Sequence, residues 1–245
     1  MSEQQKVALI TGANKGIGLE TARQLGKLGV TVLVGARDAA KGEKAAAALK
    51  SEGIDARAVK LDVVNSADVK AAAKWMEREF GRLDILVNNA AINLDGGMGH
   101  ETSTVSQEVL RETFATNFFA LIELTQAVLP LLRKSAAGRI VNVSSRQGSL
   151  ALLAPEGSEI YATKTFAYDA SKSALNSFTL HLAHELRGTK IKVNSIHPGW
   201  VRTDMGGRNA TLGLEDGAKT SVRLALVGED GPTGGYFHLG ERLAW

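Results

Sequence analysis

A tyrosine and a lysine four residues apart are the first candidates for chemistry in this 245-residue chain. They are Tyr168 and Lys172, within a run of residues that has helical periodicity. Positions i and i+4 share one face of a helix, so the phenol and the ammonium point into the same space. An unperturbed tyrosine titrates near a pKa of about 10, and a nearby ammonium stabilises the phenolate and lowers that value. The pair therefore predicts a site where Tyr168 gives a proton to an alkoxide and reclaims it in the reverse direction.

A second tyrosine, Tyr161, stands seven residues earlier and is the rival for this role. The residue one helical turn after it is Thr165, and Lys164 lies one position too early. The spacing therefore assigns the proton to Tyr168. It places Tyr161 in the loop-like stretch that precedes the helix.

Glycines cluster where the first expected strand, Lys6–Ile10, runs into a helix. The turn reads TGANKGIG over residues 11–18. Glycine permits a tight strand-to-helix turn and lets the backbone approach a pyrophosphate, while the N-terminus of the helix adds unpaired N–H groups and a positive dipole end. The spacing is G-x-x-x-G-x-G, not the G-x-G-x-x-G of many other dinucleotide sites. The residues of this turn that we expect to contact the dinucleotide are Gly12, Asn14, Lys15, Gly16, Ile17 and Gly18.

The end of the second expected strand indicates which dinucleotide is bound. An acidic residue there would accept hydrogen bonds from an NAD ribose, whereas a cation accommodates a 2′-phosphate. The chain has Ala36 in the acidic position, followed by Arg37, whose guanidinium can form a two-pronged contact with phosphate. Lys15 can add a second cation, and Asp38 is interpreted as a helix cap. The sequence therefore predicts NADP(H).

Together, the glycine turn and the Y-x-x-x-K pair resemble the signature of the short-chain dehydrogenase/reductase family, and the similarity continues through nearly the whole chain. Asn88-Asn89-Ala90, at the end of the fourth expected strand, matches a family motif that supports the sheet and contacts the cofactor. Ala91 stands where the family usually has glycine. The resemblance implies an NADP(H)-dependent oxidoreductase.

The resemblance also implies roles outside these motifs. Ser145, at the end of the fifth expected strand, would hold the substrate carbonyl oxygen as negative charge builds on it. Asn117 would distort its helix locally and hold a water that connects Lys172 to solvent. Thr203 would bond the nicotinamide carboxamide, and Lys172 the nicotinamide ribose. The cofactor contacts implied beyond the glycine turn and Arg37 are Asp62, Val63, Asn89, Ala90, Tyr168, Lys172, Pro198, Gly199, Val201 and Thr203.

Two of these positions, Asp62 and Asn117, allow other interpretations. Asp62 suits a turn or a helix start as well as an adenine contact. Asn117 could be an exposed polar position of its helix. His197, next to this set, is interpreted as structural, because the family does not use it as a base.

Within the family the chain is most similar to NADP-dependent carbonyl reductases. This implies reduction of a ketone, aldehyde or quinone to an alcohol by hydride transfer from NADPH, with Tyr168 as general acid. The expected partner is a small-molecule carbonyl substrate. Two alternatives stay open: a 3-oxoacyl-thioester reductase, and an NADP-sensing regulatory protein that has lost catalysis. The similarity is carried by residues 11–18, 35–38, 116–119 and 198–205, and by an insertion at 148–166.

The elements that must position these residues alternate along the chain. Short apolar runs and longer helical patterns predict an α/β fold: a doubly wound, Rossmann-type, mostly parallel sheet with helices on both faces. We expect one domain, 1–245, with the cofactor half at about 1–135 and the catalytic half at about 136–245. The expected strands are Lys6–Ile10, Val30–Ala36, Ala56–Leu61, Leu83–Asn88, Arg139–Ser144 and Lys190–Ile196. The expected helices are Gly16–Lys27, Ala39–Ser51, Ser66–Phe80, Thr104–Leu132 and Tyr168–Leu186.

Two segments interrupt this alternation, and both are expected at the carboxyl edge of the sheet, where open α/β folds bind ligands. Gly148–Phe166 contains apolar residues that need burial, either against the substrate pocket, which we favour, or over the helices through which relatives dimerise. Gly199–Glu215 is rich in glycine and is expected to be mobile. Whether the protein is a monomer or a homo-oligomer stays undecided.

Composition excludes several classes of function. The chain has no cysteine, hence no disulfide or thiolate metal site, and no metal is expected. The net charge of +3 is scattered rather than clustered, which argues against a nucleic-acid partner. No apolar run approaches the roughly 18–20 residues of a membrane span, and the N-terminus does not resemble a secretory signal. The expected location is therefore the cytoplasm.

Overall fold

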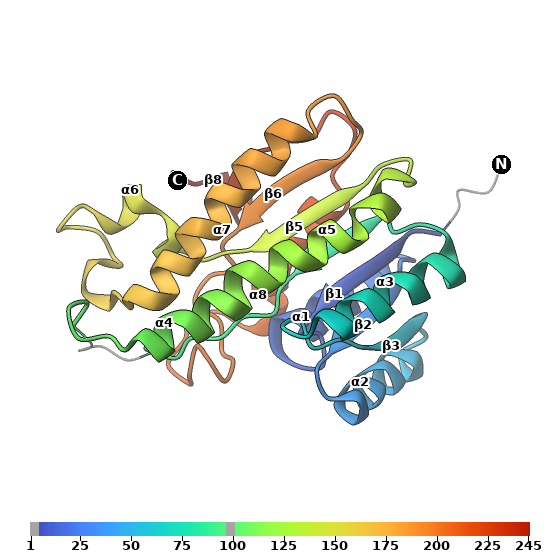
Figure 1. The fold of residues 1–245 in the computed structure, drawn as a ribbon, viewed down its shortest axis with the longest axis horizontal. Coiled ribbons are helices and arrows are strands. Elements are labelled where there is room, and N and C mark those ends of the chain that lie inside the picture. Colours follow the sequence, from blue (N-terminus) through green and yellow to red (C-terminus); the bar gives the residue numbers. More distant parts are fainter. Residues whose placement is uncertain (1–4, 97–100) are drawn as a thin grey trace.

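The computed structural model describes residues 5–96 and 101–245. The strands in this part of the chain form one eight-stranded sheet in the order β3-β2-β1-β4-β5-β6-β7-β8 (Figure 1). All neighbours are parallel except β7 and β8. Strand order reverses between β1 and β4, and a crevice at such a reversal is where open α/β sheets bind ligands. The strands are β1 (Val7–Thr11), β2 (Thr31–Ala36), β3 (Ala56–Lys60), β4 (Ile85–Asn88), β5 (Arg139–Val143), β6 (Lys192–Ile196), β7 (Gly235–His238) and β8 (Glu241–Arg242).

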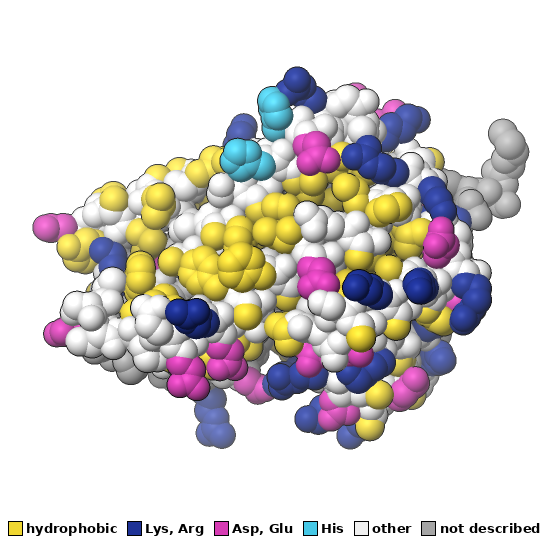
Figure 2. Space-filling view, in the orientation of Figure 1, with side chains coloured by type: hydrophobic (Ala, Val, Ile, Leu, Met, Phe, Trp, Pro, Cys, Tyr) yellow, Lys and Arg dark blue, Asp and Glu magenta, His cyan; other side chains and the backbone are white. Residues whose placement is uncertain are grey.

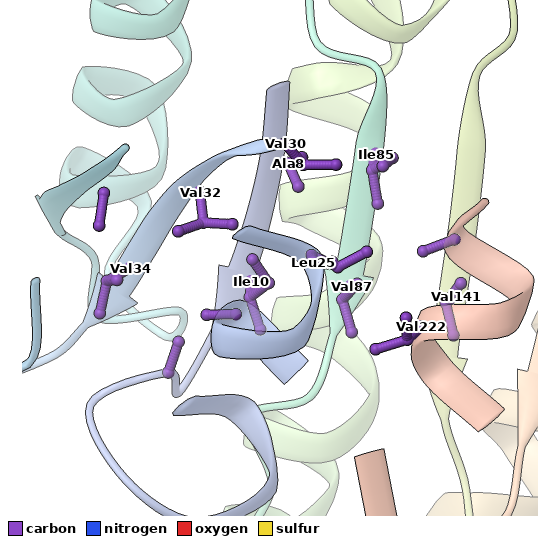
Figure 3. Packing of buried hydrophobic residues seen from close by; sticks show 14 of the residues in the cluster. Ala8, Ile10, Leu25, Val30, Val32, Val34, Ile85, Val87, Val141 and Val222 are labelled. Carbon is purple, nitrogen blue, oxygen red and sulfur yellow. The ribbon is translucent and has the colours of Figure 1, made fainter. Parts of the chain in front are cut away.

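Helices cover both faces of the sheet because each strand is apolar on both sides. Ala8 and Ile10 of β1 point to one core cluster and Val7 and Leu9 to the other. Figure 3 shows the first cluster, where Leu25 and Val222 pack on the strands. Its helices are α1 (Gly16–Lys27), α2 (Ala39–Ser51) and α8 (Leu214–Ala225). The second cluster includes α3 (Ser66–Phe80), α5 (Ala120–Arg133) and α7 (Phe166–Glu185), in front of the sheet in Figure 1.

Helix ends follow local capping chemistry. The Asp38 carboxylate accepts the Lys41 N–H (3.1 Å), so the predicted cap of α2 is confirmed. Asn65 caps α3 by accepting two N–H groups. Gly81 ends the same helix with φ of 69°, a left-handed conformation that costs glycine little.

The predicted fold class is confirmed, and helices α1, α2 and α3 have the predicted bounds. The six predicted strands are present with ends shifted by at most two residues, and the predicted helix Tyr168–Leu186 is α7, which begins two residues earlier and ends one residue earlier. The predicted helix Thr104–Leu132 is wrong as one element: it comprises α4 (Gln107–Phe114), a π-helical turn at Ala115–Phe119 and α5. The last helix and strands, α8, β7 and β8, were not predicted. Their strands are only four and two residues long, too short for an alternating pattern to show.

One helical run among the described residues, Gln107–Arg133, is long and apolar enough to pass a length-and-composition test for a membrane span. Buried core helices pass the same test, and 44% of its most apolar window is buried within the protein. Leu124 and Val128 in this run belong to the second core cluster.

The segment Gly199–Glu215, predicted to be mobile, is held by internal hydrogen bonds. The Trp200 indole donates to the Gly206 carbonyl (2.8 Å), and Arg202 donates to the carbonyls of Ala210 (3.2 Å) and Thr211 (3.3 Å). Val201 pairs with Leu212 as an isolated bridge. The glycines therefore serve an organised turn and not an unstructured loop.

Candidate active site

Helix α7 brings the proton-transfer pair into the protein interior. Tyr168 is 8% exposed and Lys172 is 2% exposed. The Lys172 ammonium lies 5.5 Å from the centroid of the Tyr168 ring, as i and i+4 spacing requires. Its Nζ donates to the carbonyl of Val143 (2.8 Å) at the end of β5. The pair is therefore fixed against the carboxyl end of a central strand.

The expectation that Lys172 lowers the pKa of Tyr168 is wrong for the protein by itself. Burial raises the pKa of the phenol to about 12, because a phenolate there loses its hydration. Hydrogen bonding to Ser145 opposes this shift, and the charge of Asp169 adds to it. Burial also lowers the pKa of Lys172 to about 7, so its amine is only partly protonated at neutral pH. The tyrosine is consequently a protonated acid at neutral pH, the form a proton donor needs.

Ser145 stands beside this pair at the start of the loop after β5. Its hydroxyl accepts the Gln147 N–H (3.3 Å), which begins a 3₁₀ turn at Arg146–Gly148. Gly148 packs closely on α7: a Cβ there would come within 2.7 Å of the Lys172 backbone. The close approach explains why glycine is needed, and it holds the serine loop against the helix that carries Tyr168.

Asn117 lies at the centre of the π-helical turn and is 1% exposed. Its amide donates to the Ile92 carbonyl (2.8 Å) and to the Ser171 hydroxyl (3.1 Å), and its oxygen accepts the Ile92 N–H (2.9 Å). The predicted local helix distortion is present, and the alternative of an exposed polar position is wrong. Asn117 joins three segments: its own helix, the stretch after β4, and α7.

The glycine turn lies beside the end of β4, as predicted. Asn89 donates from its amide to the Thr11 carbonyl (2.8 Å), and the Asn89 and Ala90 N–H groups both donate to the Thr11 hydroxyl (2.9 Å each). Gly12 has φ of +62°, and a Cβ at Gly18 would come within 2.6 Å of the Asn89 amide nitrogen. Both glycines are therefore required by the backbone geometry.

The two predicted phosphate-binding cations differ in their surroundings. Arg37 is exposed at the end of β2. Lys15 is paired with Asp204 (2.5 Å), although both side chains are largely exposed. Such an exposed ion pair contributes about 0–1 kcal/mol to stability, so Lys15 can exchange this partner for a phosphate at little cost.

The segment after β6 faces the glycine turn. A Cβ built at Gly16 would have the Thr203 methyl group, 3.7 Å away, as its nearest neighbour. Thr203 accepts the Gly206 N–H (3.0 Å), and Val201 is buried while Pro198 and Gly199 are half-buried. The turn and this segment therefore lie side by side, and the surface that they border is called the candidate cofactor groove.

His197 occupies a buried position where it acts as an acceptor. Its Nδ1 accepts the Arg146 N–H (3.2 Å), and its ring lies 4.8 Å from that of His238. Burial, followed by the nearby His238 and Arg146, lowers the pKa of His197 to about 3. The imidazole is therefore neutral and holds the loop that contains Ser145, in agreement with a structural role.

Asp62 and Val63 lie in the turn that follows β3. The Asp62 carboxylate accepts the Val64 N–H (3.3 Å), a turn contact that agrees with the alternative interpretation of this residue. Val63 lines a small pocket together with Thr11 and Ala90. Val63 is thus next to the glycine turn, as a cofactor contact must be.

The insertion Gly148–Phe166 lies at one end of α7 and away from the outer faces of α5 and α7 (Figure 1). It contains the short helix α6 (Leu150–Leu153), which is tied to the end of the chain. The hydroxyl of Ser149, the N-cap residue, donates to the Ala244 carbonyl (2.9 Å), and the Ala151 N–H donates to the Trp245 carbonyl (3.0 Å). Of its apolar side chains, Leu150 is 67% exposed. Leu152, Leu153 and Ile160 are half-buried. The insertion does not cover the outer faces of α5 and α7, where hydrophobic side chains are exposed (Figure 2), so the alternative of a cover over these helices is not seen in this structure. The favoured alternative, that the insertion lines the substrate pocket, stays a prediction.

Tyr161 sits on the surface of this insertion, where the Lys164 ammonium lies 3.8 Å from its ring centroid. It is 37% exposed, in contrast to the buried Tyr168. The assignment of the acid to Tyr168 therefore agrees with the environment of each phenol.

Sequence patterns did not point to several residues around this site. Asp95 is 3% exposed and accepts two N–H groups of α7. Tyr236 of β7 is fully buried. Burial raises the pKa of Tyr236, and a negative charge on Tyr168 would raise it further. Asp204 pairs with Lys15 across the groove. None of these contacts joins near neighbours in the chain, so no local spacing signals them. Within residues 5–96 and 101–245, no cluster of three metal-ligating side chains occurs.

Known proteins with a similar sequence or structure indicate the family of this chain. The family profile described as short chain dehydrogenase matches residues 6–211. The chain belongs to this family.

Carbonyl reductase [NADPH] 1 of Sus scrofa is 35% identical over 96% of this chain and 92% of its own length. (+)-Neomenthol dehydrogenase of Arabidopsis thaliana is 32% identical over 96% of each chain. The structure of NADPH-bound carbonyl reductase from chicken fatty liver has a TM-score of 0.85 with 27% identity, covering 99% of this chain and 100% of the other. The predicted family and its similarity to carbonyl reductases are confirmed.

Proposed function

We propose that this short-chain dehydrogenase/reductase reduces ketones, aldehydes or quinones to alcohols with NADPH, with Tyr168 as the acid. The observation that carries the proposal is the joint placement of Ser145, Tyr168 and Lys172 at the carboxyl end of β5, next to the groove of the glycine turn. The carbonyl reductases to which the chain is similar are named for NADPH, and similar structures hold NADP(H). An NADP-dependent oxidoreductase is the class that these relatives support.

The glycine turn supports a dinucleotide site. The helix α1 begins within this turn and has no side-chain cap at its N-terminus, and Thr203 approaches Gly16 from the segment after β6. Uncapped N–H groups at a helix start attract phosphate. Arg37, exposed just after β2, would supply the positive charge for the 2′-phosphate. We assign the cofactor to Gly12, Asn14, Lys15, Gly16, Ile17, Gly18, Arg37, Asp62, Val63, Asn89, Ala90, Tyr168, Lys172, Pro198, Gly199, Val201 and Thr203.

Each catalytic side chain has a distinct task. The bound NADPH supplies the hydride. Ser145 donates to the substrate oxygen and stabilises charge that develops there. Tyr168, protonated because burial raises its pKa to about 12, gives its proton to that oxygen. Lys172, held by the Val143 carbonyl, bonds the nicotinamide ribose. Asn117 holds the backbone of Ile92 and, as in the family, would hold a water that connects Lys172 to solvent.

The mouth of the site favours apolar substrates. The segments that follow β4, β5 and β6 leave the carboxyl edge of the sheet, and each exposes a large apolar side chain: Leu94 is 43%, Leu150 67% and Trp200 53% exposed. An apolar wall discriminates weakly between substrates, since one methylene is worth only about 1–3 kcal/mol. We therefore propose a broad carbonyl substrate range.

The proposed function predicts NADPH oxidation, followed at its absorbance, in the presence of a quinone or an activated ketone. The proposed carbonyl reductase activity implies a lower kcat/KM for a 3-oxoacyl thioester than for the quinone or ketone. Preference for the thioester would favour the 3-oxoacyl-thioester reductase instead. NADPH binding without oxidation by any carbonyl would favour the NADP-sensing protein.

Removal of the Arg37 guanidinium tests the choice of cofactor. We expect Arg37→Ala to weaken NADPH binding by about 10- to 100-fold, since a charge-assisted bond to phosphate is worth about 1.5–3 kcal/mol. NADH, which has no 2′-phosphate, should bind about as before. Titration of both cofactors by fluorescence measures the two affinities.

Arg78→Ala is the matched control. Arg78 is exposed at the end of α3, near the start of β3, where it pairs with Glu79. It should leave both affinities unchanged. An equal loss for NADPH and NADH in Arg37→Ala would show that Arg37 does not contact the phosphate.

We further propose that the chain works as one domain, with residues 1–135 holding most of the cofactor and residues 136–245 supplying most of the catalytic side chains. The sheet runs through both halves, because β4 pairs with β5 between them. The cytoplasmic location expected from the sequence remains a prediction.

A further inference from the structure

Helix α7 begins without help from its own N-cap residue. The first N–H groups of a helix have no partner within it and need one from outside. Thr165, the N-cap, makes no capping hydrogen bond with its side chain. Its hydroxyl and its N–H both donate to the Asp169 carboxylate, at 3.0 Å and 3.1 Å. The N–H groups of Ala167 and Tyr168 are therefore left for another acceptor.

That acceptor is Asp95, 72 residues earlier than Ala167 in the chain. Its Oδ2 accepts the Ala167 N–H (2.6 Å) and its Oδ1 accepts the Tyr168 N–H (3.3 Å). The carboxylate is 3% exposed, so these bonds do not compete with bulk water. A negative charge at a helix N-terminus is also favoured by the helix dipole. Asp95 thus holds the backbone of Tyr168 itself.

Asp95 is in turn fixed to the rest of the site. Three residues before it, Ile92 is held at both its N–H and its carbonyl by the Asn117 side chain. The same Asn117 amide donates to Ser171 of α7, one turn after Tyr168. At the start of the segment, Asn89 bonds the glycine turn through the Thr11 carbonyl. One short stretch therefore spans from the cofactor groove to the first turn of α7.

From this arrangement we propose that Asp95 is a positioning residue of the reaction: it anchors the first turn of α7, so that the Tyr168 phenol is held in register with Ser145 and the cofactor groove. The inference rests on the proposed function, because it concerns the proton-donating role of Tyr168. Asp95 bonds the backbone of α7 and acts through this helix. A displacement of about 1 Å in a reacting group can cost roughly 100-fold in rate.

The test compares Asp95→Ala and Asp95→Asn with a matched cap variant, Asn65→Ala. Asn65 accepts two N–H groups at the start of α3, at 2.9 Å and 3.3 Å, on a helix without a catalytic side chain. Steady-state reduction of a quinone by NADPH gives kcat and KM, a fluorescence titration gives the NADPH affinity, and thermal unfolding gives stability.

We expect Asp95→Ala to lower kcat by about 10- to 100-fold, with the carbonyl KM and the NADPH affinity nearly unchanged. Asp95→Asn should recover part of kcat, since an amide oxygen still accepts an N–H. Asn65→Ala should lose about as much thermal stability as Asp95→Ala and keep its kcat. Hydrogen exchange at residues 166–172 should be faster in Asp95→Ala and unchanged in Asn65→Ala.

Several results would overturn the inference: wild-type kcat in Asp95→Ala, equal kcat in Asp95→Ala and Asp95→Asn, a loss of NADPH affinity as large as the loss of kcat, or unchanged exchange at residues 166–172. Wild-type protein that oxidises no NADPH with any carbonyl would instead refute the proposed function. An active wild type with an equally active Asp95→Ala would refute the positioning role alone.

Discussion

Replacement of Tyr168 by phenylalanine is expected to lower kcat for carbonyl reduction by about 100- to 10 000-fold, the usual range for loss of a general acid. Only the transferable proton is removed. The ring stays in its buried place beside Lys172, so folding should be retained. NADPH affinity should be nearly unchanged, because the glycine turn and Arg37 remain. Steady-state kinetics and a cofactor titration measure both quantities.

Tyr161→Phe is the control for this experiment. Tyr161 is 37% exposed and its ring contacts Lys164, which the substitution preserves. We expect turnover within about twofold of wild type, as for most surface substitutions. If Tyr161→Phe were the damaging change, the acid would lie in the insertion and the assignment of Tyr168 would fail.

The second large effect concerns Lys172, on activity and on stability against pH. Lys172→Met keeps much of the volume of the side chain but removes the bond to the Val143 carbonyl and the bond proposed to the nicotinamide ribose. We expect kcat to fall by about 100-fold, because the cofactor would no longer be held in position and a displacement of about 1 Å costs roughly this factor.

The pH dependence follows from burial. Because burial lowers the pKa of Lys172 from its ordinary value of 10.5 to about 7 on folding, the unfolded chain binds more protons between these values. The free energy of unfolding of the protein without cofactor should then rise with pH across about 7 to 10, by at most about 1.4 kcal/mol per pH unit from this group.

Denaturant unfolding of wild type and Lys172→Met at several pH values isolates this contribution as the difference in slope. Lys190→Met is the control, since Lys190 is 69% exposed and pairs with Glu229 at the surface. Its slope should equal that of wild type. Equal slopes in wild type and Lys172→Met would show that Lys172 stays charged in the folded protein.

Where short-range rules act, the sequence was sufficient. Gly12 and Gly18 were predicted from their place between a strand and a helix, and the structure requires glycine at both. Tyr168 and Lys172 share a helix face because four residues make about one turn. The cap at Asp38 also depends only on residues nearby in the chain. Resemblance to a family, and not spacing, identified Ser145 and Asn117.

The tertiary structure alone decided the electrostatics and the anchoring of the site. The pKa of Tyr168 is raised and not lowered, because burial outweighs a lysine that is itself desolvated. Asp95 reaches Tyr168 and Asp204 reaches Lys15 only once the strands have been ordered in the sheet. Backbone geometry determines contacts within one or two turns, so the chain's local order is readable from its sequence. Burial and partners from distant segments depend on how the layers pack, and these set the protonation and position of each catalytic group.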